Sequence, residues 1–137
     1  MIQDNLALAR EFEEQERYQE ALAEYGRAVQ ASPNDAEPLL CRGALLGELG
    51  QYEAAIADFS AVLAIDPYNG SAYNNRGDLH ASLGRHEAAI ADFSQALSLN
   101  DADVDSYYNR GLSLAELRKL QDARADLDTA LTLDPFT

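Results

Sequence analysis

Small and apolar side chains recur with helical spacing along the chain. In residues 36–69, Leu39, Gly43 and Leu46 lie three to four positions apart, and Ala55 and Phe59 resume this spacing after a polar break. Residues at i, i+4 and i+7 line one face of an α-helix, and an apolar face of this kind needs a surface to pack against. The pattern predicts two amphipathic helices in this segment, packed on each other.

The whole pattern returns with a period of 34 residues. Pro33, Pro67 and Pro135 occupy one position of this period, and Asp101 stands where a fourth proline would lie. Segments 42–67 and 76–101 agree at 14 of 26 positions. Such self-similarity indicates a repeat protein, whose units bury their apolar faces on their neighbours. We predict a single all-α domain over residues 1–137, with units at 2–35, 36–69, 70–103 and 104–137.

Turn and capping residues mark the helix ends within each unit. Gly50 and Gly84 are expected to end the first helices of their units, because the residue past a helix end often adopts a left-handed conformation that glycine tolerates. Asp35, Asn69 and Asp103 precede the next first helices. Their side chains can accept hydrogen bonds from the unpaired backbone N–H groups there, so we expect them to be N-caps.

These features resemble the tetratricopeptide repeat family. The resemblance rests on the small residue after Arg42, the Gly-Gln-Tyr turn, Ala55, Phe59 and the closing Asp-Pro, and it extends over essentially the whole chain. It implies a right-handed α-solenoid of about eight helices, with the first helix of each unit on a concave face. Glu16 and Arg118 replace the turn glycine in the outer units, and we expect these departures to blur the turn geometry but not the fold.

The resemblance also implies a function, the binding of a peptide or helix of a partner protein in the concave groove. Asn75 and Asn109 lie where some members carry an asparagine ladder, and an amide can pair with any peptide backbone. Alternatively, these two amides bond to each other or to water. Leu40 and Tyr108 are expected anchors, unless neighbouring helices partly bury them. The candidate groove residues are Leu6, Arg10, Leu40, Cys41, Asn74, Asn75, Asp78, Tyr108, Asn109 and Leu112.

Another site of the family, the two-carboxylate clamp for chaperone C-termini, is not expected here. That clamp needs Lys, Asn, Asn, Lys and Arg at set positions of three consecutive units. Here the positions hold Leu6, Arg10, Cys41, Ser71 and Asn75, or Leu40, Ala44, Asn75, Asp105 and Asn109 one unit later. A chaperone tail would therefore meet too few cations.

A repeated pair of opposite charges suggests a structural role. Arg and Asp recur together in the last three units, whereas the first unit has Leu8 and Glu24 at the same positions. We expect an ion pair between the two helices of each unit, although copying of a unit could preserve both residues without contact. The expected pairs are Arg42 with Asp58, Arg76 with Asp92, and Arg110 with Asp126.

Composition narrows the class of partner. The chain has 10 basic and 24 acidic residues and a formal charge of -14. This charge repels nucleic acid and anionic membranes, so we expect neither as a partner. It favours a partner of basic character near Glu13, Glu14, Glu48 and Glu116, or it only keeps the outer surface soluble. With no leader and no long apolar run, a cytoplasmic location is expected; a removed signal or a larger parent protein stays open.

Catalytic and metal sites are not indicated. His80 and His86 occupy positions where the repeat expects a ring in the packed interior. The run Asp101, Asp103, Asp105 begins like a calcium loop but lacks the required Gly and the final Glu. Cys41 is the sole cysteine, so it forms no internal disulfide. We expect no enzyme, no metal and no cofactor, with a regulatory segment of a larger enzyme as a third alternative.

The last helix carries apolar residues that would contact a following helix in the family. These are Ala123, Leu127, Ala130, Leu131 and Phe136. Three alternatives follow: the sequence is part of a longer protein, this end pairs between molecules, or the helix tolerates exposure. Weak self-association through the C-terminal end is therefore the alternative function.

Overall fold

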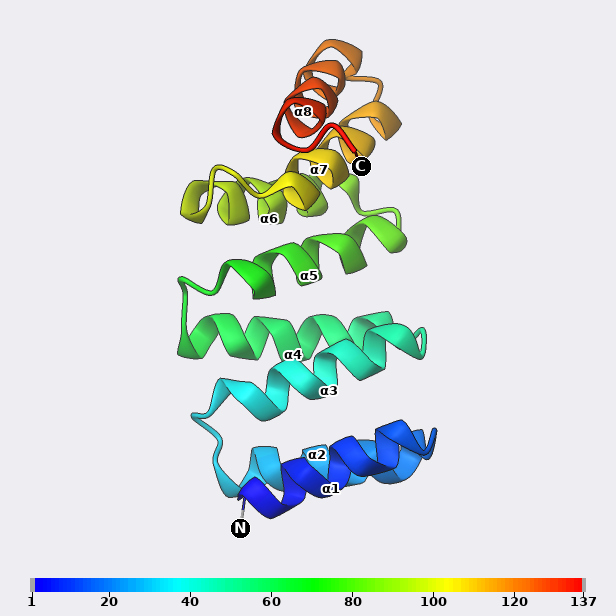
Figure 1. Ribbon diagram of the computed structural model, residues 1–137, viewed down its shortest axis with the longest axis vertical. Helices are drawn as coiled ribbons and strands as arrows, with labels where there is room; N and C mark the ends of the chain where they lie inside the picture. Colours follow the sequence, from blue (N-terminus) through cyan, green and yellow to red (C-terminus); the bar gives the residue numbers. More distant parts are fainter. Residues whose placement is uncertain (1, 137) are drawn as a thin grey trace. The chain divides into compact units, whose positions relative to one another are not determined.

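The computed structural model describes residues 2–136, which form eight α-helices and no strand (Figure 1). Thr137, the last residue of the predicted fourth unit, lies outside the described residues. The helices are α1 (Ile2–Glu14), α2 (Tyr18–Ala31), α3 (Ala36–Glu48), α4 (Tyr52–Ile65), α5 (Gly70–Ser82), α6 (His86–Leu99), α7 (Val104–Glu116) and α8 (Leu120–Leu133).

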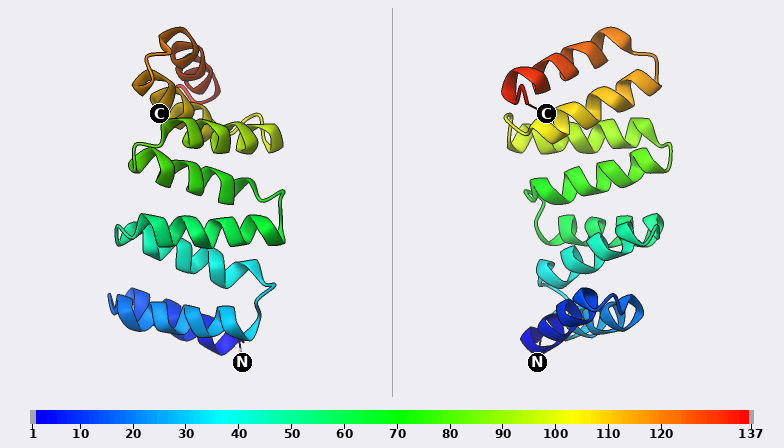
Figure 2. Two further views of the ribbon diagram at one scale, coloured as in Figure 1. Left: turned by 180° about the vertical axis from the view of Figure 1, so that it is seen from behind. Right: turned by 45° about the vertical axis from the view of Figure 1, so that its right-hand side comes forward.

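The helices form four pairs, as the period predicts. In α1 with α2, α3 with α4, α5 with α6 and α7 with α8, the two helices lie antiparallel and side by side in all the views (Figures 1 and 2). The chain divides into two compact units, Met1–Pro67 and Tyr68–Thr137, which hold two helix pairs each. We call them unit 1 and unit 2. A single domain over the chain stays a prediction.

The turn inside each pair has the same geometry in all four repeats. The backbone is left-handed at Gly50 (φ 79°) and Gly84 (φ 76°), and equally at Glu16 (φ 60°) and Arg118 (φ 63°). The next residue of each turn donates its N–H to the carbonyl five positions earlier, at 2.8 to 2.9 Å. The expectation of a blurred turn in the outer repeats is therefore wrong. The hydrogen-bonded turn holds two non-glycine residues in a conformation that costs about 1–2 kcal/mol.

The expected N-caps are confirmed. Asp35, Asn69 and Asp103 have extended backbones, and each side chain accepts a hydrogen bond from a backbone N–H two or three residues later, at 2.9 to 3.3 Å. These bonds satisfy donors that have no partner within the helix. The sequence thus specifies where α3, α5 and α7 begin.

Small residues allow the two helices of a pair to approach closely. A Cβ atom placed on Gly43 would lie 3.1 Å from Cζ of Phe59, and one on Gly77 would lie 2.9 Å from Cε1 of Phe93. Phe59 and Phe93 are both buried. A glycine on one helix therefore receives an aromatic ring from the other.

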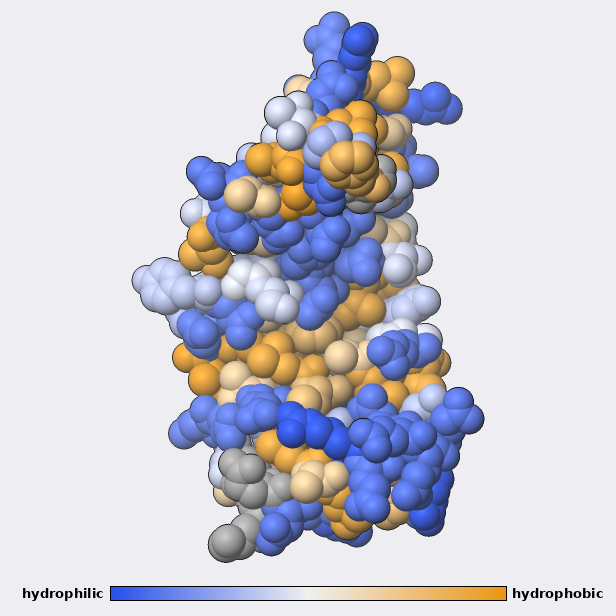
Figure 3. Space-filling view, in the orientation of Figure 1, coloured by the Kyte–Doolittle hydropathy of each residue, from blue (hydrophilic) through white to orange (hydrophobic). Residues whose placement is uncertain are grey.

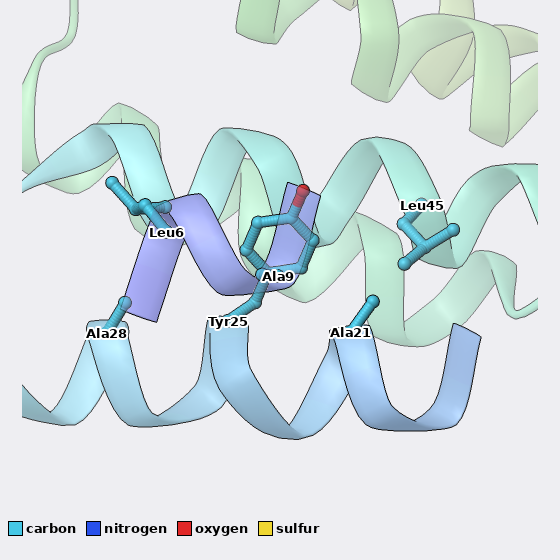
Figure 4. Close-up of a cluster of buried hydrophobic side chains, with 6 residues drawn as sticks. All are labelled: Leu6, Ala9, Ala21, Tyr25, Ala28 and Leu45. Atoms are coloured by element: carbon cyan, nitrogen blue, oxygen red, sulfur yellow. The ribbon is translucent and has the colours of Figure 1, made fainter. Parts of the chain in front are cut away.

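The core of unit 1 joins three helices. Its buried cluster takes residues from α1, α2 and α3, and Figure 4 shows their side chains converging between these helices. The members are Leu6, Ala9, Ala21, Tyr25, Ala28 and Leu45. Because Leu45 belongs to the following repeat, the first helix pair completes its core only when the next helix covers it.

Candidate functional site

The three expected ion pairs are present, and each joins the two helices of one repeat. Arg42 donates from Nε and Nη2 to the Asp58 carboxylate at 2.9 and 2.8 Å. The corresponding bonds measure 2.9 and 2.7 Å for Arg76 with Asp92, and 2.7 and 2.8 Å for Arg110 with Asp126. All three aspartates are buried. These residues therefore have a structural role in the fold.

The first repeat replaces this pair by a different polar contact. Glu24 is buried, accepts a hydrogen bond from Asn5 Nδ2 at 2.9 Å, and pairs with Arg27. Asn5 lies on α1, so a hydrogen bond from a neutral amide links the helices here. The negative charge of Glu24 is still compensated, because Glu24 pairs with Arg27 on the same helix.

A hollow of about 420 Å³ lies in unit 1 and is called the unit 1 hollow. Residues from α1, α2 and α3 line it, and three of them are glutamates. The lining residues are Arg10, Glu13, Glu14, Tyr25, Cys41, Ala44, Leu45 and Glu48. The structure therefore brings together the predicted groove residues Arg10 and Cys41 with the acidic residues that were expected to favour a basic partner.

Two contacts within the unit 1 hollow hold its polar side chains. Arg10 Nη2 donates to Glu37 Oε1 at 2.7 Å and lies 3.8 Å from Sγ of Cys41, and these contacts raise the pKa of Arg10. The Tyr25 hydroxyl donates to Glu13 Oε1 at 2.6 Å. Burial first, and this bond second, raise the pKa of Tyr25 above its ordinary value. Arg10 is thus partly neutralised, which leaves the hollow acidic.

Leu6 does not belong to the groove. Its side chain is only 3% exposed and packs in the unit 1 core with Tyr25 and Ala28. Its assignment as a partner-binding residue is wrong, because the buried side chain leaves almost no surface for a partner to contact. Leu40, one period later, is half-buried.

Unit 2 carries a second hollow of about 420 Å³, the unit 2 hollow. It is lined mainly by amides and carboxylates of α5 and of the residues before and within α7. The lining residues are Gly70, Ser71, Asn74, Asn75, Ala96, Asn100, Asp103 and Asp105. Predicted groove residues Asn74 and Asn75 therefore lie in one polar depression.

The two asparagines of the unit 2 hollow differ in what holds them. Asn74 Nδ2 donates to Ser106 Oγ at 2.8 Å and lies 3.3 Å from Asp103 Oδ2, so it fastens α5 to α7. Asn75 is exposed, and within residues 2–136 its side chain makes no hydrogen bond. Asn75, rather than Asn74, thus offers a free donor and acceptor to a partner.

Asp78 lies on α5, in a setting unfavourable to its charge. The surrounding protein reduces the hydration of the carboxylate, and the nearby carboxylate of Asp105 repels it; both effects raise the pKa of Asp78. Within the described part of the chain, neither aspartate forms an ion pair. The two carboxylates of Asp78 and Asp105 therefore favour a cation supplied by another molecule.

A third hollow, the α8 hollow, is apolar. It has a volume of about 460 Å³ and is lined by Tyr108 of α7 with Leu127, Ala130 and Leu131 of α8. Figure 3 shows hydrophobic surface over α7 and α8 among hydrophilic side chains. Tyr108, expected as an anchor in the groove, thus lines a hollow beside α8. Whether the chain self-associates through this face stays a prediction.

The other predicted groove residues lie on first helices but line none of these three hollows. Asn109 is half-buried and Leu112 is exposed. Their contact with a partner therefore stays a prediction, as does that of Leu40. Sequence reasoning missed Asn100 and Asp103 as lining residues, because they lie in the loop between repeats, and only the fold brings that loop beside α5.

In residues 2–136, no three His, Cys, Asp or Glu side chains are grouped so that they could hold a metal ion. None of the described helices combines the length and apolar character that crossing a bilayer requires. His86 Nδ1 lies 3.3 Å from Ser113 Oγ, so this histidine takes part in packing α6 on α7.

Comparisons with known proteins agree on the fold. A family model described as TPR repeat matches residues 9–50, 46–84 and 77–118, and a model described as tetratricopeptide repeat matches residues 104–136. A search of curated protein sequences found no match.

Several solved structures are similar to the chain. A crystal structure of MamA has a TM-score of 0.94 at 22% identity, covering 98% of this chain and 73% of that chain. A MamA structure from Desulfovibrio magneticus RS-1 has a TM-score of 0.92 at 24% identity, covering 98% and 76%. The first TPR of Spaghetti (RPAP3), bound to the HSP90 peptide SRMEEVD, has a TM-score of 0.73 at 29% identity, covering 74% and 81%. The predicted fold class, an α-solenoid of tetratricopeptide units, is confirmed.

Proposed function

Because the chain belongs to the tetratricopeptide repeat family, we propose that it is a protein-interaction scaffold. The segment it binds is an extended or helical stretch of a partner protein that carries basic side chains. The binding surfaces are the unit 1 hollow and the unit 2 hollow, on the first helices of the repeats. No catalytic step is part of this proposal.

The observation that carries the proposal is the arrangement around Asn75 in unit 2. Its side chain offers a donor and an acceptor that no described residue uses. Three residues later, Asp78 has a raised pKa because of reduced hydration and the charge of Asp105. An amide ready for backbone pairing beside two uncompensated carboxylates matches a peptide segment with a Lys or Arg side chain.

The unit 1 hollow supports the same class of ligand. Glu13, Glu14 and Glu48 line it, and its single cation, Arg10, is engaged by Glu37. The net charge of -14 adds a long-range attraction for cationic segments. Exposed charges are screened over about 8 Å at physiological salt, so this attraction mainly accelerates association.

The ligand class differs from the one seen in a similar structure. The TPR of Spaghetti (RPAP3) is bound to a peptide with acidic residues, SRMEEVD. In this chain carboxylates line both hollows, and Asp105 stands where a clamp would need a cation. An acidic peptide would therefore be repelled, whereas a basic one would relieve the repulsion between Asp78 and Asp105.

The test selects peptides from a random display library on the immobilised chain and measures their affinity by fluorescence anisotropy. We expect the selected peptides to contain Lys or Arg. Asn75→Ala combined with Asn109→Ala is expected to weaken binding by about 1–3 kcal/mol, since each replaced amide removes one or two hydrogen bonds. Asp78→Asn should reduce the association rate and its salt dependence.

The control is Glu87→Gln, an exposed change on the second helix α6. It removes one negative charge, as Asp78→Asn does, but on a second helix rather than on α5 beside Asn75. If Glu87→Gln weakens binding as much as Asp78→Asn, only net charge matters and the surface around Asn75 and Asp78 is not the site. Selected peptides without basic residues would contradict the proposed ligand class.

A further inference from the structure

An ion pair in unit 1 joins the first helices of two successive repeats. Arg10 of α1 donates from Nη2 to Glu37 Oε1 of α3 at 2.7 Å. The same nitrogen lies 3.8 Å from Sγ of Cys41, which is also on α3. The side chains of Arg10 and Glu37 are 53% and 52% exposed, so the pair lies at the surface of unit 1. A guanidinium of the chain itself thus faces two acceptors that the next first helix presents.

Unit 2 presents the acceptors of this contact again, but with a carboxylate in place of the arginine. The residues that stand two periods after Arg10, Glu37 and Cys41 are Asp78 of α5 and then Asp105 and Asn109 of α7. Helices α5 and α7 contact each other within unit 2. The carboxylate of Glu37 thus has its counterpart in Asp105, and the amide oxygen of Asn109 is a stronger acceptor than the thiol of Cys41.

These three side chains of unit 2 have no partner within residues 2–136. Asp78, Asp105 and Asn109 make neither a side-chain hydrogen bond nor an ion pair there. Reduced hydration, and then the charge of Asp105, raise the pKa of Asp78, so the two carboxylates lie close enough to repel each other. A cation placed as Arg10 is placed in unit 1 would relieve this repulsion.

We propose that Asp78, Asp105 and Asn109 bind the guanidinium of one arginine of the partner. This inference rests on the proposed scaffold function and assigns its basic side chain one residue type and one place. The guanidinium donates to the two carboxylates and to Oδ1 of Asn109, and so takes the place that Arg10 has in unit 1. Arg10 is accordingly an internal occupant, which closes the equivalent place in unit 1 to a partner.

Arginine fits this place better than lysine does. A guanidinium has several N–H donors in a rigid plane, so one side chain can donate to acceptors from two helices at once. The ammonium group of lysine is a compact charge with stronger hydration. Unit 1 gives the internal precedent, because a single nitrogen of Arg10 faces both acceptors of α3. The arrangement therefore selects for arginine among basic side chains.

The test titrates the full chain with a short peptide of alanine and serine that has one central arginine. Two-dimensional NMR follows the backbone amide signals of the protein. We expect saturable shifts at Asp78, Asp105 and Asn109. Citrulline in place of the arginine keeps the shape without the charge and should abolish these shifts. Lysine in place of the arginine should weaken binding by about threefold or more.

Variants of the protein test the three residues separately. Asp105→Asn should weaken binding of the arginine peptide by about fivefold, and Asn109→Ala by about threefold. Asp78→Arg should abolish binding at this place, because the new arginine would pair with Asp105 as the corresponding residues pair in unit 1. The control Glu87→Gln removes an exposed charge from α6 and should change the affinity by less than about twofold.

Arg10→Asp tests whether the two places are equivalent. This variant removes the internal guanidinium and gives unit 1 the same pair of carboxylates that unit 2 has. It should let unit 1 bind a second arginine peptide, with new shifts at Glu37 and Cys41. Signals of these two residues that do not respond to the peptide in this variant would overturn the proposal.

Failure of this inference and failure of the proposed function give different results. If the arginine peptide shifts only residues away from Asp78, Asp105 and Asn109, or if the lysine peptide binds equally well, the inference is wrong and the proposed function stands. If the citrulline peptide binds as well as the arginine peptide, both are wrong. Both are also wrong if no basic peptide, including those selected by display, binds to the chain.

Discussion

Replacing Arg42 by Met should destabilise the fold far more than replacing an exposed arginine. The Asp58 side chain is 7% exposed and that of Arg42 is 28% exposed, and two short hydrogen bonds join them. Methionine keeps most of the aliphatic length but removes the charge. The Asp58 carboxylate is then left buried without a cation, which is much costlier than losing a pair in water.

The magnitude follows from the number of bonds and from the exposure of Arg42. Hydrogen bonds to charged groups contribute about 1.5–3 kcal/mol each, and breaking a buried pair costs about 3–5 kcal/mol. Because Arg42 reaches water in part, we expect Arg42→Met to lower the free energy of unfolding by about 2–4 kcal/mol. Asp58→Asn should cost less, about 1–2 kcal/mol, since the remaining guanidinium can be hydrated.

The assay is urea unfolding followed by circular dichroism, with a double-mutant cycle that adds Arg42→Met combined with Asp58→Leu. The matched control is Arg124→Met, which removes an arginine whose side chain is 85% exposed and 3.8 Å from Asp128. It should change stability by less than about 0.5 kcal/mol. Equal effects of Arg42→Met and Arg124→Met, or a coupling energy near zero in the cycle, would refute the reasoning.

Three further predictions concern the turns, the helix crossings and alkaline pH. Glu16→Gly should raise the free energy of unfolding by about 1 kcal/mol, because glycine tolerates the left-handed backbone there, and the melting temperature should rise with it. Gly50→Ala should lower the free energy of unfolding by a similar amount. Gly77→Ala should destabilise by about 1–2 kcal/mol because its Cβ would lie 2.9 Å from the buried Phe93 ring. In contrast, Gly26→Ala, with 3.7 Å of room, should stabilise α2 by up to about 1 kcal/mol in the same urea assay. Because the fold raises the pKa of Tyr25, its contribution to stability is present below the unfolded pKa of about 10 and is lost as pH rises above it. The melting temperature of the Tyr25→Phe variant should therefore fall less steeply with rising pH above about 10 than that of the original chain.

The sequence by itself determined the repeat, the helices and the contacts inside a helix pair. The period of 34 residues and the i, i+4, i+7 spacing specify two helices per repeat, and Asp35 begins a helix because its side chain caps its own backbone. The ion pair of Arg42 with Asp58 was also predictable, since both residues recur together and lie 16 positions apart across a single turn. These features depend on neighbours within one repeat, so a local pattern is enough to specify them.

Only the tertiary structure decided which residues of a repeated position are exposed. Leu6, Leu40, Asn74 and Tyr108 occupy the same position of the repeat, yet Leu6 is buried, Tyr108 is exposed, and Leu40 and Asn74 are half-buried. Asn74 is held by Ser106 of the next repeat, and Leu6 packs in a cluster that Leu45 of the next repeat completes. The exposure of one position is set by the helix that packs on it from the following repeat. That helix lies about one period away in the sequence, so a local pattern does not reveal the contact.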